Sequence, residues 1–200
     1  MREGRSTEDV AALLATAGEA LRAGRWEEAR AGFETALEAE ESGEALFGLA
    51  LALWWLRDPV SSVRLQERAF GMFRQAGDNE NAFFTAMYLC LGYDMTFGNL
   101  SASRGWLAKA SRVVEDCGLG ALRGWLLLCE AVALHHDDLV AAEGKAREAL
   151  EVARETGERD LDMCARASSA QRSSSWAGPV RGRRCWTRRW RERSVARCMI

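Results

Sequence analysis

The most constraining feature of this 200-residue sequence is a frame of small and apolar residues that recurs at near-equal intervals. The first copy consists of Trp26, Ala29, Phe33, Ala36 and Leu37, and further copies begin at Leu100 and Leu139. A weaker copy begins at Val60, where Glu67 occupies the third place. Steps of three and four residues place side chains on one face of a helix. An internal repeat of this length predicts stacked copies of one supersecondary unit.

Each copy is preceded by a second amphipathic stretch and followed by a glycine. The preceding stretches cover residues 7–22, 44–56, 79–97 and 119–136. The glycines are Gly43, Gly77, Gly118 and Gly157, and we expect each to end a helix in the left-handed conformation. Short breakers separate the two helices of each pair, namely Ala23-Gly24, Asp58-Pro59, Gly98-Asn99 and Asp137-Asp138. The predicted unit is a helix, a tight turn, a second helix and a longer turn, repeated four times.

The frame resembles the tetratricopeptide repeat, and the residues that match it are Gly24, Trp26, Ala29, Phe33, Ala36 and Leu37. The resemblance implies an all-α fold, a right-handed solenoid of helical hairpins with four units over residues 1–165 and a disrupted fifth beginning at Asp160. The later units are longer than the 34-residue repeat, which suggests lengthened helices. Large apolar residues of the frame should be buried where units stack. These are Trp26, Phe33, Phe70, Trp106, Leu107 and Leu150.

The charge of the chain changes abruptly near residue 166. Residues 1–165 carry 17 Lys and Arg against 28 Asp and Glu, whereas residues 166–200 carry ten Arg and one acid, Glu192. Trp176, Trp186 and Trp190 also lie in this basic tail. Such a tail can bind nucleic acid by phosphate neutralisation and base stacking, which is one interpretation of the segment.

A frameshift is the second interpretation of the tail. If each codon starts one base earlier, the pair Trp176-Ala177 must encode Gly, Cys185-Trp186 must encode Leu and Trp186-Thr187 must encode Asp. With GC-rich codons, the shifted frame can read as another copy of the repeat. We therefore hypothesise that a base insertion or deletion near residues 166–169 replaced the fifth repeat and everything after it. The 166–200 segment is then an out-of-frame, poorly ordered tail.

Several classes of protein are disfavoured by the sequence. The longest uncharged apolar run, residues 45–56, is too short to span a bilayer, and the first residues do not read as a secretory signal. Six cysteines without C-x-x-C spacing indicate reduced thiols and a cytoplasmic protein. We expect Cys90, Cys117, Cys129 and Cys164 to behave as small hydrophobic residues.

No catalytic motif or phosphate-binding loop is present in the sequence, so we expect no enzyme activity and no cofactor. The run His135-His136-Asp137-Asp138 contains metal-ligating residue types, but adjacent histidines on a helix point about 100° apart. The run also occupies the place of the turn inside each repeat. We interpret it as a polar turn and expect no metal site.

Residues 44–58 (EALFGLALALWWLRD) and 138–157 (DLVAAEGKAREALEVARETG) resemble the N-terminal repeat region of LuxR-type helix-turn-helix regulators of actinobacteria. The resemblance implies a protein-interaction or signal-sensing module of a transcriptional regulator, without the DNA-binding domain in this chain. A free-standing tetratricopeptide adaptor and a nucleic-acid-binding protein acting through its tail are the alternatives. An incomplete last repeat would leave an apolar face open and favour self-association.

Aromatic residues are concentrated in the first helix of each predicted pair, which lines the concave surface in the tetratricopeptide fold. Most of these rings are expected to pack in the core, while a few facing the groove would anchor a protein or peptide partner. Tyr88 and Tyr93 are the strongest candidates, because each combines an apolar ring with a polar hydroxyl. The candidate partner-binding residues are Trp54, Trp55, Phe84, Tyr88, Tyr93 and Trp125.

Overall fold

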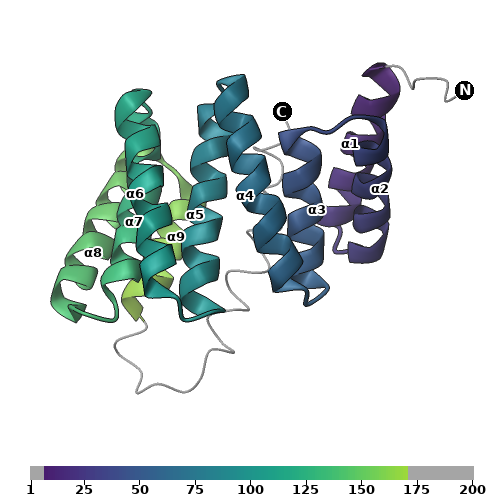
Figure 1. Ribbon diagram of the computed structural model, residues 1–200. Helices are drawn as coiled ribbons and strands as arrows, with labels where there is room; N and C mark the ends of the chain where they lie inside the picture. The colour runs from purple at the N-terminus through teal and green to yellow at the C-terminus, as the bar shows by residue number, and fades with distance from the viewer. Residues whose placement is uncertain (1–6, 171–200) are drawn as a thin grey trace, which may run out of the picture. The chain divides into compact units, whose positions relative to one another are not determined.

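The computed structural model describes residues 7–170, and every regular element in this range is a helix (Figure 1). The α-helices are α1 (Thr7–Arg22), α2 (Trp26–Ala39), α3 (Gly43–Trp55), α4 (Pro59–Ala76), α5 (Asn79–Met95), α6 (Leu100–Asp116), α7 (Arg123–Leu134), α8 (Leu139–Thr156) and α9 (Arg159–Ala170). One 3-10 helix, η1 (Gly120–Leu122), precedes α7. The predicted all-α class is thus confirmed for residues 7–170. Residues 171–200, on which both interpretations of the basic tail mainly depend, lie outside the described residues.

The helices begin and end largely where the sequence pattern places them. Asp58, Asn99 and Asp138 accept hydrogen bonds from the first free backbone N–H groups of α4, α6 and α8. Gly77 and Gly157 end α4 and α8 in the left-handed conformation, with φ of 74° and 71°. These caps explain why short polar breakers and glycines predict the boundaries of the second helices so closely.

Two predicted boundaries are wrong. Gly43 does not end α2 but is the first residue of α3, where a Cβ atom would lie only 2.9 Å from the ring of Phe73. The helix before it ends at Ala39 with Glu40 extended. The stretch predicted as one helix over residues 119–136 divides into η1 and α7, and α7 ends at Leu134.

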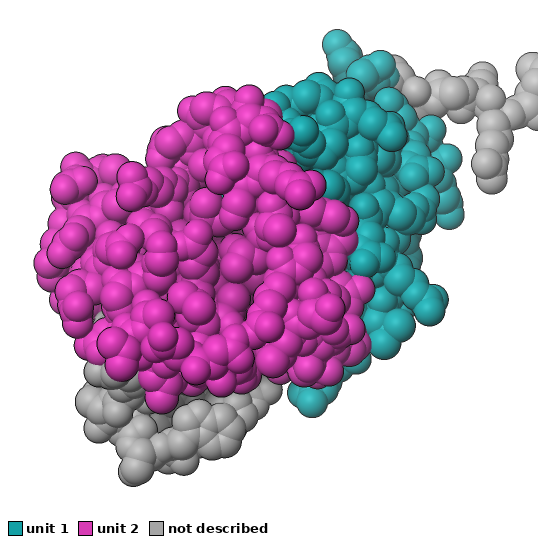
Figure 2. Space-filling model, turned by 60° about the vertical axis from the view of Figure 1, so that its left-hand side comes forward, with its two compact units in different colours: residues 1–85, 190–200 teal, residues 86–189 magenta. Residues whose placement is uncertain are grey.

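The described residues divide into two compact units, residues 7–85 and residues 86–170, which Figure 2 distinguishes by colour. The division falls inside α5, between Thr85 and Ala86. We describe each unit by itself.

In unit 1, α1 packs against α2 and α3, α2 packs against α3, and α3 packs against α4. Phe33 of α2 is fully buried and covers Gly48 of α3, where a Cβ atom would lie 2.3 Å from its ring. Most of α3 is buried on all sides, which accounts for its nearly continuous apolar sequence. The hydroxyl of Ser62 on α4 donates to the carbonyl of Ala50 at 2.7 Å, which satisfies a polar group inside this core.

In unit 2, α7 packs against α8 and α9, α8 packs against α9, and α6 contacts α7. Gly124 of α7 permits a close approach of α9, since a Cβ atom there would lie 2.2 Å from Cδ2 of Leu161. Trp106 of α6 is buried, and the ammonium of Lys109 lies 3.7 Å from the centre of its ring. The core position predicted for Trp106 is therefore confirmed, as is that of Phe33 in unit 1. The other four predicted core residues, Trp26, Phe70, Leu107 and Leu150, are half-buried.

Candidate functional site

The six aromatic residues predicted to bind a partner occupy two kinds of environment. Phe84 on α5 and Trp125 on α7 are buried. The remaining four, Trp54 and Trp55 in unit 1 and Tyr88 and Tyr93 in unit 2, are half-buried. The structure does not bring the six together within one unit, and partner binding by them stays a prediction. The half-buried residues are the ones whose rings reach the surface.

The turn inside each hairpin of unit 1 carries aromatic and basic residues. We call this surface the unit 1 turn edge; it comprises the turns at residues 23–25 and 56–58 with the adjoining Trp26, Trp54 and Trp55. Trp26 begins α2 and Trp55 ends α3, and their rings stack with centroids 5.1 Å apart and planes inclined by 15°. Offset-stacked rings at this distance attract one another beyond the gain from burial. The stack therefore joins the two turns into one surface.

Arg57 has an unusual backbone conformation at this edge. Its φ is 68°, and it is the one non-glycine residue with a positive φ in residues 7–170. Its N–H donates to the carbonyl of Trp54 at 3.2 Å, and the N–H of Asp58 donates to the carbonyl of Leu53 at 2.9 Å. Gly24 and Gly98 hold the corresponding place in two other turns, with φ of 77° and 61°. In these three turns the position is held by a left-handed residue, and only at Arg57 is that residue not glycine; the turn at residues 135–138 contains no residue with a positive φ.

Carboxylates close to the unit 1 turn edge are already engaged. The Nε of Arg25 pairs with Glu28 at 2.6 Å. The carboxylate of Asp58 accepts a hydrogen bond from the N–H of Ser61 at 3.1 Å. The side-chain and backbone hydrogen bonds of Ser61 hold the pKa of Asp58 below its ordinary value. The side chain of Arg57 is exposed and makes no hydrogen bond or ion pair with any residue from 7 to 170. The edge therefore presents an unpaired guanidinium two residues after Trp55.

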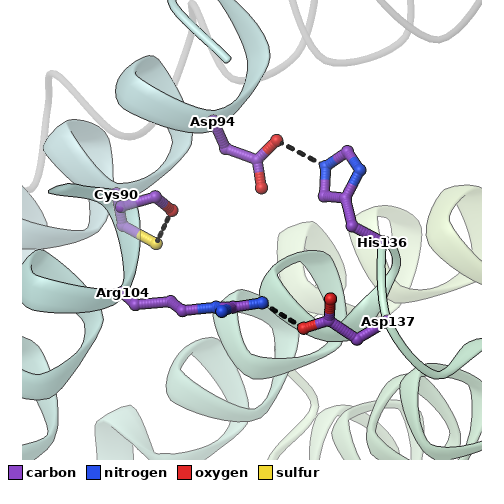
Figure 3. A network of polar contacts seen from close by, with 6 residues as sticks. Cys90, Asp94, Arg104, His136 and Asp137 are labelled. Atoms are coloured by element: carbon purple, nitrogen blue, oxygen red, sulfur yellow. Dashed lines mark hydrogen bonds and ion pairs between the residues drawn. The ribbon is translucent and has the colours of Figure 1, made fainter. Parts of the chain in front are cut away.

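The corresponding turns of unit 2 are joined by polar contacts instead (Figure 3). We call this surface the unit 2 turn edge; it comprises the turns at residues 96–99 and 135–138 with the adjoining Asp94 and Arg104. His136 Nε2 and Asp94 Oδ1 are hydrogen-bonded at 2.8 Å, and Arg104 forms an ion pair with Asp137. The Asp94 side chain is 5% exposed and that of His136 is 45% exposed. The outcome confirms that residues 135–138 form a polar turn, whose polar contacts run to α5 and α6.

Buried thiols lie beneath this polar edge. The Sγ of Cys90 lies 3.4 Å from the Oγ of Ser103. Burial raises the pKa of Cys90, the nearby Asp94 carboxylate adds to that increase, and the contact with Ser103 opposes it. Complete burial raises the pKa of Cys129 well above its ordinary value. Both groups are therefore neutral thiols at physiological pH, in agreement with their predicted role as small hydrophobic residues.

Sequence reasoning missed the two features that distinguish the edges. Arg57 lies two residues before α4, as Gly24 and Gly98 do before α2 and α6, but the breaker predicted from the sequence was Asp58-Pro59, which does not include Arg57. The contacts of His136 with Asp94 and of Asp137 with Arg104 join residues 42 and 33 positions apart. A local sequence pattern does not predict contacts between residues so far apart. In residues 7–170 no three His, Cys, Asp or Glu side chains gather closely enough to hold a metal ion.

Comparison with known proteins does not place the chain in a family: no family model, curated protein or solved structure matches it. Within the part of the chain that the structure describes, no helix has both the length and the apolar character needed to cross a membrane.

Proposed function

We propose that the chain is a protein- or peptide-binding module built as a tetratricopeptide-like solenoid of helical hairpins, and that it serves as the interaction or signal-sensing part of a LuxR-type transcriptional regulator. The packing order within each unit supports the solenoid. In unit 1 the first helix of one hairpin, α1, contacts both its own partner α2 and the first helix of the next, α3. In unit 2, α7 contacts α8 and α9 in the same way.

This recurring three-helix arrangement is the observation that carries the proposal. Each hairpin has an apolar side that it cannot cover alone, so stacking on the next hairpin buries it. In such a scaffold the first helices line the concave surface, which can serve as a binding surface. Tyr88 and Tyr93 lie on α5, the first helix of the third hairpin, and are half-buried. Aromatic side chains with a polar end are frequent anchors of protein interfaces.

Selection of peptides from a displayed library on the immobilised full chain tests this proposal. We expect selected peptides whose affinity, measured by isothermal titration calorimetry, falls about tenfold or more when Tyr88→Ala and Tyr93→Ala are combined. Met95→Ala is the control, because Met95 is an exposed apolar side chain at the end of α5, and this variant should bind the peptides with unchanged affinity. Peptides that bind the double variant as tightly as the parent chain would overturn the role of this surface.

A further inference from the structure

We infer that the unit 1 turn edge is a second binding surface, and that it fits an acidic peptide segment in which carboxylates flank an apolar side chain. In this arrangement Arg57 pairs with a carboxylate of the segment, while the apolar side chain packs on the tryptophans at residues 26, 54 and 55. The inference assumes, with the proposed function, that the chain binds peptides. It uses a surface in unit 1, whereas Tyr88 and Tyr93 belong to unit 2.

The backbone at Arg57 supplies the first argument. A non-glycine residue in the left-handed region is strained by the close approach of its Cβ atom to the backbone, and glycine avoids this strain. Gly24 and Gly98 fill the same place with φ of 77° and 61°. An arginine at this place weakens the turn without a compensating contact for its side chain in residues 7–170. Strained backbone conformations that do not stabilise the fold cluster at functional sites.

The second argument is the chemistry of the neighbours. Tryptophan and arginine are the residue types most enriched among those that dominate binding energy at protein interfaces. The exposed Arg57 follows Trp54 and Trp55 with one residue between, and the stack with Trp26 orients the ring of Trp55. A rigid ring binds an apolar side chain with little loss of conformational entropy.

The third argument is charge. Among the nearby carboxylates, Glu27 pairs with Arg30, Glu28 pairs with Arg25, and Asp58 is bonded to the N-terminus of α4. Arg57 is left without an internal counter-charge among the described residues. A guanidinium pairs best with a carboxylate, which it can contact through two parallel hydrogen bonds. The complementary partner is therefore acidic.

Titration of the full chain with three hexapeptides tests the inference. The probe is acetyl-Glu-Glu-Leu-Phe-Glu-Glu-amide, and the two comparison peptides carry Gln or Lys in place of every Glu. We expect the acidic peptide to bind most tightly, and its affinity to weaken with added salt. Arg57→Gly should lower that affinity about three- to fivefold. Because the same substitution relieves the strained turn, the variant should melt at or above the temperature of the parent chain, so that misfolding does not account for the loss.

Matched variants test whether binding depends on this edge in particular. Arg112→Gln removes an exposed arginine of α6 in unit 2 and should leave the affinity unchanged, and the combined Tyr88→Ala and Tyr93→Ala variant should also bind the acidic peptide normally. Equal binding of the Glu and Gln peptides, or full affinity in Arg57→Gly, overturns the inference. It is also overturned if inorganic phosphate alone shifts the same indole signals in nuclear magnetic resonance spectra, which indicates a small-anion site. Loss of a dimer in Arg57→Gly without any peptide binding overturns it in favour of a second copy.

Discussion

The turn edges of the two units connect neighbouring hairpins by different chemistry. At the unit 1 turn edge, the contact that joins the two turns (here called the joint) is the stack of Trp26 on Trp55. The side chain of Arg57 takes no part in this contact. At the unit 2 turn edge the joint consists of the His136–Asp94 hydrogen bond and the Arg104–Asp137 ion pair. Apolar stacking leaves a cation available for a partner, whereas the polar joint uses its cation within the fold. Whether a surface can recognise a charged ligand therefore depends on which of its charges are already paired within the fold, and not on net charge alone.

The first prediction separates a core tryptophan from an edge tryptophan and has the largest expected effect. Trp106→Ala should lower the free energy of unfolding by about 3–5 kcal/mol, because it removes a buried ring and leaves a cavity. Urea unfolding followed by circular dichroism measures this loss. A loss no greater than that of Trp55→Ala would show that burial of Trp106 adds nothing, and would remove the contrast between core and edge.

The second prediction tests the polar joint. Asp94→Ala should lower the free energy of unfolding by about 1–3 kcal/mol, since Asp94 is buried and is the partner of His136. Asp116→Ala is the matched control: Asp116 is an exposed acid at the end of α6, and its removal should change the value by less than about 0.5 kcal/mol. Equal stability of the two variants would mean that unit 2 does not depend on this joint.

The third prediction tests the aromatic joint. Trp55→Ala should cost about 1–2 kcal/mol, because it removes half-buried ring area and the stacking attraction to Trp26. Trp54 is similarly half-buried but has no stacked partner among residues 7–170, so Trp54→Ala should cost less. Chemical unfolding of both variants under one set of conditions measures the difference. If the order is reversed, the stack is not what joins the two turns.

The fourth prediction has the smallest expected effect and the opposite sign. Arg57→Gly should raise the free energy of unfolding by about 1 kcal/mol, because glycine adopts the left-handed conformation without a Cβ penalty. Gly24→Ala should lower it by a similar amount, since Gly24 has φ of 77° in the corresponding turn. Thermal melts of the two variants against the parent chain measure both signs. A destabilised Arg57→Gly variant would indicate that the guanidinium supports the fold.

The helix boundaries that depend on residues adjacent in the chain were predictable from the sequence. The helix α1 covers the predicted residues 7–22, and α2, α6 and α8 begin at Trp26, Leu100 and Leu139 as the frame indicates. The predicted end of α2 at Gly43 was wrong: the helix ends at Ala39, and Gly43 begins α3, where its contact with Phe73 of another helix is not evident from any local pattern. The joint between His136 and Asp94 also depends on distant residues, so the sequence predicted the polar turn but not its partner.

The candidate site was predictable to a smaller extent. Helical periodicity showed that aromatic residues gather in the first helices, but it did not show which rings the packing would bury. Phe84 and Trp125 are buried, whereas Trp54, Trp55, Tyr88 and Tyr93 reach the surface. That difference depends on the contacts of each helix with the next hairpin and on how closely small residues such as Gly48 allow it to approach.

The division between Thr85 and Ala86 falls within a continuous helix, and this has a practical consequence for dissecting the chain. A fragment cut at the division would sever backbone hydrogen bonds of α5 and expose new unsatisfied groups at both ends. The left-handed glycine at residue 77 offers a better place to separate the halves, because the chain already leaves its helix there. Circular dichroism of the separate fragments 1–77 and 78–200 is therefore the more promising way to ask whether either half folds alone.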